Sequence, residues 1–153
     1  VIINAMNLTR IKGSPYYNEN YFSYDYLSRA KKGLIFINVT RGEIAPEPVL
    51  LKLYDQGVLG GIGLDVFSNE HDFSLAVQKG QVETVNNRVA AALVLLQMAE
   101  SRMGNIYVQP HQGFNSDLAV ESKAADTISH MISWYQNGKK RFDEQLPYYQ
   151  DVI

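Results

Sequence analysis

The stretch LIFINVTRGEIAPEPVLLKLYDQGVLGGIGLDV, residues 34–66, decides the expected fold. It opens with an apolar run at 34–39 that barely alternates, which is typical of a strand in a sheet covered on both faces. A helix is predicted over 46–56, with proline in its first turn and Gly57 just past its end. The segment 58–66 contains a further strand, in which three glycines allow close backbone approach. Strand, helix and strand in this order predict parallel strands joined by a helical crossover.

The same order continues on both sides of this stretch. The further predicted elements are a strand at 1–6, a helix over 20–32 capped by Asn20, a helix over 84–103, a short strand at 106–108, a helix over 116–137 capped by Ser116, and an irregular end at 139–153. The two long helices each carry one apolar stripe at helical spacing. The stripes are Val85, Val89, Leu93, Leu96 and Met103, and Leu118, Ala125, Ile128, Ile132 and Tyr135. This alternation predicts an α/β fold, a parallel sheet flanked by helices.

The composition excludes several classes of function. The 153 residues suit one domain, and 46% hydrophobic with 20% charged residues is ordinary for a globular protein. A net charge of −2 gives no basic footprint for nucleic acid and no polybasic patch for a membrane surface. The sequence has no cysteine, so disulfides and cysteine metal sites are excluded, and we predict no metal site. No apolar run approaches the roughly 20 residues of a membrane span, and no signal-peptide pattern is present, so we expect a cytoplasmic location.

Polar residues with useful chemistry follow the predicted strands. Arg41 comes after the strand at 34–39, Asp65 ends the next strand with Glu70 five residues on, and His111 follows the strand at 106–108. In a parallel sheet all of these emerge at the carboxyl edge, where ligands bind. An arginine can grip a carboxylate with two parallel hydrogen bonds, and a histidine oriented by a carboxylate can carry a proton. The pattern therefore favours an active site at this edge.

Each of these residues has a simpler interpretation when taken alone. An arginine after a strand is more often a surface residue, and a histidine after proline in a loop is usually structural or solvated. Asp65 could cap the following loop, and Glu70 could be an exposed charge. Only the joint placement of these side chains at the strand ends supports a site.

Three sequence blocks carry a resemblance to a known family. They are INVTRGE at 37–43, GLDVFSNE at 63–70 and NIYVQPH at 105–111. They resemble the Asn-x-(Ala/Ser)-Arg-Gly, Leu-Asp-Val-(Phe/Tyr)-x-x-Glu and Asn-Val-x-x-Thr-Pro-His segments of the NAD-dependent D-isomer-specific 2-hydroxyacid dehydrogenases. Asn7-Leu8-Thr9 stands where the family has Pro-Leu-Thr. The order and approximate spacing of the blocks agree over 1–138.

The resemblance implies a catalytic role for three residues. Arg41 would bind the carboxylate and the carbonyl oxygen of a 2-oxo acid. His111 would donate a proton to that oxygen as hydride arrives, and would remove it in the reverse direction. Glu70 would hydrogen-bond His111 and help it keep its proton. Arginine and protonated histidine would together stabilise the negative charge that hydride transfer builds on the substrate oxygen.

The resemblance also implies a cofactor site for NAD. Asp65 would meet the nicotinamide end, Val39, Thr40 and Gly113 would line the cleft with their backbone, and Asn7 would lie beside the cofactor. NADP stays an alternative, because the residue that reads the 2′ position lies outside these 153 residues. The implied partner is a small 2-oxo or 2-hydroxy acid, and the long apolar helix over 84–103 points to a homodimer.

One expected motif is absent. The family's cofactor domain starts with a strand, a Gly-x-Gly-x-x-Gly loop and a helix that binds the pyrophosphate. Gly61-Ile62-Gly63 is no substitute, because Val66 stands in place of the third glycine and the glycines lead into a strand. We therefore expect a partial Rossmann-like sheet that lacks the first βαβ unit. The expected parts are the C-terminal part of a dinucleotide-binding domain at 1–115, with a helical excursion at about 84–103, a returning helix at 116–138 and a C-terminal tail at 139–153.

Two alternatives to an enzyme fragment remain at this point. The first is an NAD-sensing, non-enzymatic module of the co-repressor kind, and the second is a non-functional truncated product. A pure scaffold has little need of both Glu70 and His111, and both are present. A reading frame that extends upstream and encodes Gly-x-Gly-x-x-Gly would dispose of the second alternative. The isolated 153 residues are expected to be inactive and to bind NAD poorly.

Overall fold

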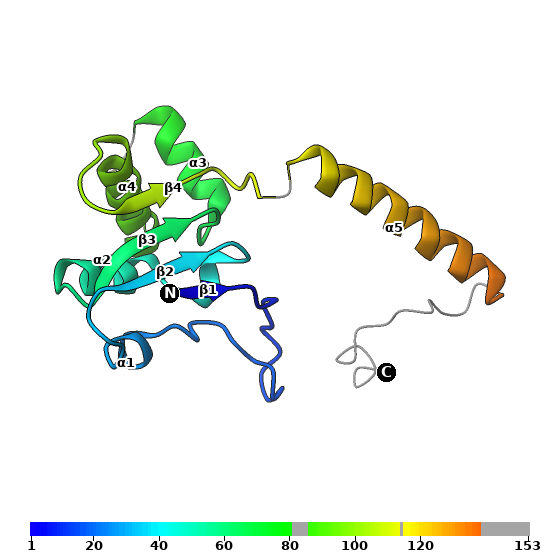
Figure 1. Ribbon diagram of the computed structural model, residues 1–153, viewed down its shortest axis with the longest axis horizontal. Coiled ribbons are helices and arrows are strands. Elements are labelled where there is room, and N and C mark those ends of the chain that lie inside the picture. The colour runs from blue at the N-terminus through cyan, green and yellow to red at the C-terminus, as the bar shows by residue number, and fades with distance from the viewer. Residues whose placement is uncertain (81–85, 114, 139–153) are drawn as a thin grey trace. The chain divides into compact units, whose positions relative to one another are not determined.

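The computed structural model describes residues 1–80, 86–113 and 115–138 (Figure 1). These residues form two compact units, which divide after Gln112 and are considered separately. Two sequence predictions fall outside the described residues: positions 84–85 of the helix expected over 84–103, with Val85, and the tail at 139–153.

The first unit is built on a sheet of four parallel strands in the order β1-β2-β3-β4 (Figure 1). The strands are β1 Ile2–Asn4, β2 Leu34–Asn38, β3 Leu59–Leu64 and β4 Ile106–Val108. One row across the sheet runs from Ile3 through Ile37 and Gly63 to Tyr107. The predicted parallel α/β sheet is therefore confirmed, and the residues that follow β2, β3 and β4 emerge at one edge.

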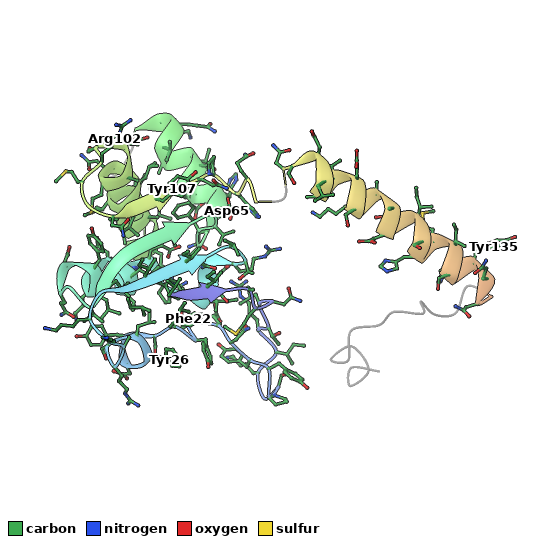
Figure 2. All side chains as sticks on the ribbon, in the orientation of Figure 1. Phe22, Tyr26, Asp65, Arg102, Tyr107 and Tyr135 are labelled. Atoms are coloured by element: carbon green, nitrogen blue, oxygen red, sulfur yellow. The ribbon has the colours of Figure 1, made fainter. Side chains whose placement is uncertain are left out.

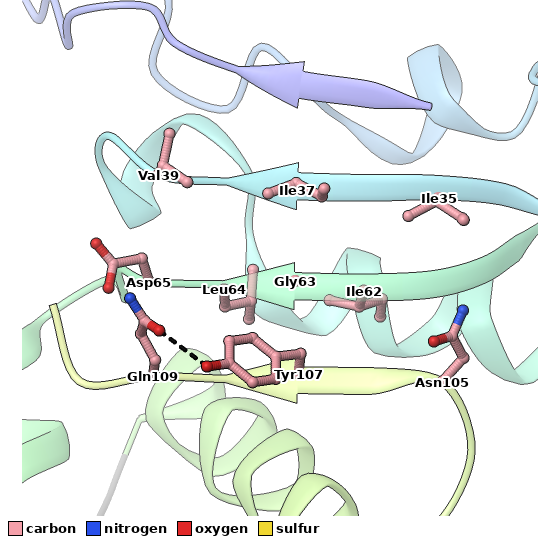
Figure 3. Close-up of a pocket in the computed structure, with 10 residues that line it drawn as sticks. All are labelled: Ile35, Ile37, Val39, Ile62, Gly63, Leu64, Asp65, Asn105, Tyr107 and Gln109. Atoms are coloured by element: carbon pink, nitrogen blue, oxygen red, sulfur yellow. Dashed lines mark hydrogen bonds between the residues drawn. The ribbon is translucent and has the colours of Figure 1, made fainter. Parts of the chain in front are cut away.

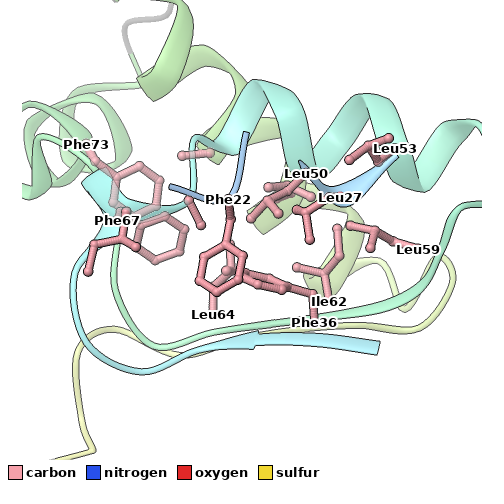
Figure 4. Close-up of a cluster of buried hydrophobic side chains, with 14 of the residues drawn as sticks. Phe22, Leu27, Phe36, Leu50, Leu53, Leu59, Ile62, Leu64, Phe67 and Phe73 are labelled. Carbon is pink, nitrogen blue, oxygen red and sulfur yellow. The ribbon is translucent and has the colours of Figure 1, made fainter. Parts of the chain in front are cut away.

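Helices cover one face of this sheet. They are α1 Tyr24–Leu27, the 3₁₀ turn η1 Gly42–Ile44, α2 Glu47–Asp55, α3 Glu70–Lys79 and α4 Asn87–Glu100. The hydrophobic core lies between them and the sheet, where Phe36 of β2 and Leu64 of β3 meet Leu50 and Leu53 of α2 (Figure 4). Burial of large apolar side chains such as these is the main favourable term in folding.

The opposite face of the sheet differs from the sequence prediction. The apolar run at 34–39 indicated a strand covered on both faces. In the structure Phe36 is fully buried, whereas Ile35 and Val39, which point the other way, are 37% and 46% exposed. Tyr107 of β4 is exposed on this same face (Figure 3). Within the described residues, only one of the two apolar faces is packed under helices.

The helix predicted over 20–32 is much shorter. The helix α1 begins after Ser23, whose Oγ accepts from the Tyr26 amide at 3.3 Å. Asn20 was predicted as the cap, but its backbone is left-handed, with φ of 60°. Its backbone N–H donates to the backbone carbonyl of Glu43 at 2.9 Å. Phe22 and Tyr26 then pack edge to face, with ring centroids 5.6 Å apart (Figure 2). A long-range backbone contact therefore replaces the first turn of the expected helix.

Helix α3 was missed by the sequence prediction. It starts at Glu70, directly after Asn69 in left-handed backbone with φ of 54°, and no side-chain cap marks its beginning. Its end at Gly80, with φ of 63°, is the usual glycine signal. Only Phe73 and Ala76 are buried in α3, so its apolar pattern is weak.

Helix α4 is shorter than predicted and buries another face. Asn86 caps it by accepting from the amides of Arg88 and Val89. The fully buried residues are Val89, Ala92 and Leu95. Leu93 and Leu96 of the expected stripe are only partly buried, and Met103 lies beyond the helix and is exposed. The buried face of α4 is the one that packs on α2 and β4. The apolar character that suggested a dimer is thus largely used inside the same unit.

The second unit contains helix α5, Asp117–Gln136, and here the prediction is confirmed. Ser116 caps the helix by accepting from the Ala119 amide at 3.2 Å, and Gly138 follows its end with φ of 67°. No residue of α5 is buried in the described structure, and the predicted apolar stripe is exposed, Tyr135 included (Figure 2).

Among the described residues, no helix is both long enough and apolar enough to cross a membrane.

Candidate active site

Two buried asparagines shape the turn after β2. Asn4 of β1 lies opposite Asn38 of β2 in the sheet register, and the Nδ2 of Asn4 donates to the Oδ1 of Asn38 at 2.9 Å. The side-chain Nδ2 of Asn4 also donates to the Oγ1 of Thr40 at 3.0 Å. The side-chain Nδ2 of Asn38 donates to the backbone carbonyl of Arg41 at 3.0 Å. Since buried polar groups need hydrogen-bond partners, this network holds Thr40 and Arg41 in one conformation.

The sequence prediction gave these asparagines no role. The sequence does contain a signal for this contact: Asn4 and Asn38 are each a polar residue at the end of an apolar strand. In the parallel register of β1 and β2 these two positions are opposite each other. A buried amide in a strand is tolerated only where a partner satisfies it. The pairing becomes visible only once β1 and β2 are placed side by side.

Asp65 connects the ends of β2, β3 and β4. It is buried, and its amide donates to the Asn38 carbonyl at 3.0 Å. Its carbonyl accepts from the His111 amide at 2.7 Å, and its Oδ1 accepts from the Gln112 amide at 2.7 Å. The carboxylate therefore holds the loop that carries His111 against the end of β3.

Glu70 and His111 form the central contact of the site. Glu70 Oε2 and His111 Nδ1 lie 3.0 Å apart, and the side chains are 42% and 38% exposed. The other carboxylate oxygen of Glu70 accepts from the Phe67 amide at 3.4 Å. His111 has left-handed backbone, with φ of 52°, which is uncommon outside glycine and directs its ring. A carboxylate on Nδ1 orients the imidazole so that Nε2 can exchange a proton with a ligand.

Arg41 lies at the same edge but makes a local contact. It immediately precedes η1, and its Nη1 donates to the neighbouring Thr40 carbonyl at 2.7 Å. Within the described residues the structure brings together Glu70 and His111, and Arg41 makes no side-chain hydrogen bond to either. Its guanidinium is exposed, which suits a group that binds a ligand from solution.

An apolar pocket of about 260 Å³ lies on the open face of the sheet (Figure 3). Val39 and Asp65, two of the predicted cofactor residues, line it at the carboxyl edge. Tyr107 forms part of its wall and donates from its hydroxyl to Gln109 Oε1 at 3.0 Å. An apolar pocket with a carboxylate at one end fits a flat ring with a polar substituent, such as nicotinamide.

The other predicted cofactor residues lie elsewhere. Thr40 belongs to the asparagine network, and Asn7 lies in the exposed loop after β1, where its carbonyl accepts from Asn18 Nδ2 at 2.6 Å. Gly113 opens the second unit and is exposed. The chain thus offers a fit for the nicotinamide end of NAD, whereas its sequence has no Gly-x-Gly-x-x-Gly loop for the pyrophosphate.

Glu47 is a buried carboxylate that the sequence prediction missed. It begins α2 and is 1% exposed, and its Oε1 accepts from the Ser68 amide at 2.5 Å. Its Oε2 is buried without a hydrogen-bond partner among the described residues. Burial raises the pKa of Glu47 above its ordinary value of 4.5, and hydrogen bonds from Ser68 and the charge of Arg88 offset only part of this. In the sequence, a glutamate in the first turn of a helix looks like an ordinary exposed residue.

We expect Glu47→Gln to change how stability depends on pH. Because the folded state holds the Glu47 proton more tightly than the unfolded state, the free energy of unfolding falls as pH rises from 4.5 towards the raised pKa. Glutamine does not titrate, so the stability of the variant relative to the unchanged protein should rise over this range. Urea unfolding at several pH values measures the difference, with Asp55→Asn at the exposed end of α2 as the control. A difference that stays constant with pH would contradict the prediction.

Comparison with known proteins places this chain in a family. Residues 14–113 match the family model described as D-isomer specific 2-hydroxyacid dehydrogenase, NAD binding domain. This range contains all three sequence blocks, the Glu70–His111 pair and Asp65. NAD is thus the cofactor of the domain family that the chain matches.

Similar proteins carry the same kind of description. A D-specific alpha-keto acid dehydrogenase of Enterococcus faecium is 30% identical over 114 residues, which is 73% of this chain and 32% of the relative. A D-lactate dehydrogenase of Staphylococcus epidermidis is 26% identical over 117 residues, 76% of this chain and 33% of the relative. The chain thus spans about a third of the length of these relatives.

Solved structures share the fold. A D-lactate dehydrogenase from Aquifex aeolicus, complexed with NAD and lactic acid, superposes with a TM-score of 0.61 at 23% identity, covering 84% of this chain and 38% of that one. The D-lactate dehydrogenase from Lactobacillus jensenii with NAD⁺ gives a TM-score of 0.63 at 19% identity, covering 94% and 38%. The matched range, the parallel sheet and the three blocks at its carboxyl edge lead to one conclusion: the chain belongs to the family of NAD-binding domains of D-isomer specific 2-hydroxyacid dehydrogenases.

Proposed function

We propose that the protein carrying this chain transfers a hydride between NAD(H) and a D-2-hydroxy or 2-oxo acid, and that this chain supplies the proton-transfer pair. The observation that carries the proposal is the 3.0 Å contact between Glu70 and His111 at the carboxyl edge of a parallel sheet. Ligands of open α/β sheets bind at this edge. Membership of the family and the names of the relatives support the same reaction class.

His111 acts as the general acid in reduction and as the general base in oxidation. With Glu70 on Nδ1, its Nε2 gives a proton to the carbonyl oxygen of the 2-oxo acid and takes it back from the hydroxyl in reverse. Glu70 balances the imidazolium charge and keeps the ring in one orientation. Both side chains are partly exposed at the carboxyl edge, where a substrate would bind.

Arg41 binds the substrate carboxylate. Its guanidinium gives up the hydrogen bond to the neutral Thr40 carbonyl for charge-assisted bonds to a carboxylate, which are roughly twice as strong. The asparagine network holds the Arg41 backbone while the side chain moves. The substrate carbonyl is thereby held between the arginine and the histidine.

The cofactor binds at the carboxyl edge of the sheet, with its nicotinamide end at the part of the apolar pocket that Val39 and Asp65 line. As predicted from the sequence, Asp65 would meet the nicotinamide end, Val39, Thr40 and Gly113 would line the cleft with their backbone, and Asn7 would lie beside the cofactor. When bound, NADH supplies the hydride. NADP stays an alternative cofactor, because the group that reads the 2′ position belongs to the phosphate-binding part of the fold.

The decisive assay compares two polypeptides. The longest natural polypeptide that contains this chain should oxidise NADH with members of a panel of 2-oxo acids that differ in side-chain length. The isolated 153 residues should show no measurable turnover and should bind NAD weakly in calorimetry, because their sequence has no pyrophosphate loop. NADH oxidation by the isolated chain would contradict the second expectation, and a longer polypeptide inactive on the whole panel would contradict the first.

The same assay tests the non-enzymatic alternative. An NAD-sensing module would bind NADH without turnover of any 2-oxo acid, and it has little need of a Glu70–His111 pair. The homodimer and the cytoplasmic location stay predictions from the sequence. Analytical ultracentrifugation of the longer polypeptide, with and without NADH, tests the dimer.

A further inference from the structure

A second polar cluster lies beneath the active-site loop. It consists of Glu47 at the start of α2, Ser68 in the loop between β3 and α3, and Arg88 in α4. The Ser68 amide donates to Glu47 Oε1 at 2.5 Å, and Arg88 Nη1 donates to Ser68 Oγ at 2.9 Å. Arg88 Nη2 also donates to Asn20 Oδ1 at 2.5 Å. The proton-transfer and binding roles described above use none of these side chains.

Ser68 sits in the middle of the loop that carries the site. Asp65 lies three residues before it and Glu70 two residues after it. The intervening Asn69 is in left-handed backbone, with φ of 54°, a conformation that asparagine adopts more readily than most residues. Only this one residue separates Ser68 from Glu70, so a shift of the Ser68 backbone is passed to Glu70 over a short stretch of chain.

The loop is held by two sets of contacts. A Cβ added to Gly42 would overlap the backbone of Phe67 and Ser68, so the turn that follows Arg41 already touches this loop. In addition, Glu47 accepts a hydrogen bond from the Ser68 backbone amide, and Arg88 donates one to the Ser68 hydroxyl.

We propose that Glu47 and Arg88 are positioning residues of the reaction, which clamp Ser68 and so hold Glu70 at hydrogen-bond distance from His111. The proposal rests on the proposed function and adds a supporting layer to it. Neither residue touches the reacting atoms. Their effect passes through the loop backbone, and a shift of about 1 Å at a catalytic group can lower turnover about 100-fold.

The two ends of the clamp use different chemistry. Glu47 needs only an acceptor for the Ser68 amide, so glutamine can replace it through its carbonyl oxygen, whereas leucine cannot. Arg88 needs two donors in a fork that spans Ser68 and Asn20. Lysine offers a single charged nitrogen and methionine offers none, so lysine should restore part of the function and methionine none.

The experiment measures steady-state kinetics of the longest natural polypeptide that contains this chain, as Glu47→Leu, Glu47→Gln, Arg88→Met and Arg88→Lys. We expect kcat to fall roughly 10- to 100-fold in the leucine and methionine variants, with KM for the 2-oxo acid changed less than about threefold. Glutamine should stay within about threefold of the unchanged kcat. Asp55→Asn, at the exposed end of α2, is the matched control and should leave kcat unchanged.

Turnover is expressed per NADH-binding site, so that a loss of folded protein does not count as a loss of kcat. Leucine fills the volume of Glu47 with an apolar group, which keeps the buried position packed. A leucine variant with unchanged kcat per site would overturn the proposal, and so would a glutamine variant as slow as the leucine one. If even His111→Asn left turnover intact, the proposed function itself would fail, which is a separate and recognisable result.

Discussion

Replacing His111 by asparagine should lower kcat roughly 100- to 10,000-fold in the longest natural polypeptide that contains this chain, while NADH binding changes little. The size of the loss is that of a general acid removed from a proton transfer. Asparagine is the informative substitution, because the histidine has φ of 52° and asparagine tolerates left-handed backbone. His111→Ala should lose turnover as strongly, with added strain in the loop. Stopped-flow reduction of a 2-oxo acid and fluorescence titration with NADH measure the two quantities.

A neighbouring histidine supplies the control. His71 follows Glu70 in α3 and is exposed. His71→Asn should leave turnover and NADH binding as they are. Turnover that survives in His111→Asn would remove the assigned role, and a loss of NADH binding in step with kcat would move the role of His111 to the cofactor.

Phe36→Ala should destabilise the first unit by about 3–5 kcal/mol, a large share of the ~5–15 kcal/mol that holds a domain folded. Phe36 is fully buried in β2, and its ring packs edge to face on Phe22 with centroids 4.9 Å apart (Figure 4). Alanine would leave a cavity between the sheet and α2 that the surrounding side chains fill only in part. Urea unfolding followed by circular dichroism gives the change in free energy.

The adjacent residue of the same strand is the matched control. Ile35 points to the open face of the sheet and is 37% exposed, so Ile35→Ala should cost much less than Phe36→Ala. Equal losses in the two variants would mean that the open face is packed as tightly as the helix-covered one, against the burial seen here.

Prediction from sequence succeeded where neighbouring residues carry the information. Helix α2 lies within one residue of the predicted bounds at each end, because Pro46 and Gly57 terminate it through their own backbone preferences. Helix α5 follows Ser116 for the same kind of reason. Helix α3 was missed because its start is imposed by the left-handed Asn69 and lacks a capping side chain. The helix expected over 20–32 lost its first turn to a hydrogen bond between Asn20 and Glu43.

The same distinction between local and long-range information applies to the candidate site. Arg41, Asp65, Glu70 and His111 could be placed at one sheet edge from the order of strands alone, since parallel strands end together. The distance between Glu70 and His111 could not, because the two residues are 41 positions apart and the Asp65 hydrogen bonds bring their loops together. Arg41 was expected to bind the substrate. Its hydrogen bond to the neighbouring Thr40 carbonyl depends on the side-chain conformation, which the spacing of residues in the sequence does not predict.

The sequence by itself determined the parallel α/β sheet, the ends of helices α2 and α5 and the edge where chemistry is expected, because these depend on side-chain pattern and backbone preference along a short stretch of chain. Only the tertiary structure decided that Asn4 meets Asn38, that one apolar face of the sheet lies open, and that Glu47 and Arg88 meet at Ser68. The physical reason is that burial and hydrogen-bond partnership depend on segments far apart in sequence, and a buried carboxylate looks like an exposed one until its neighbours are in place.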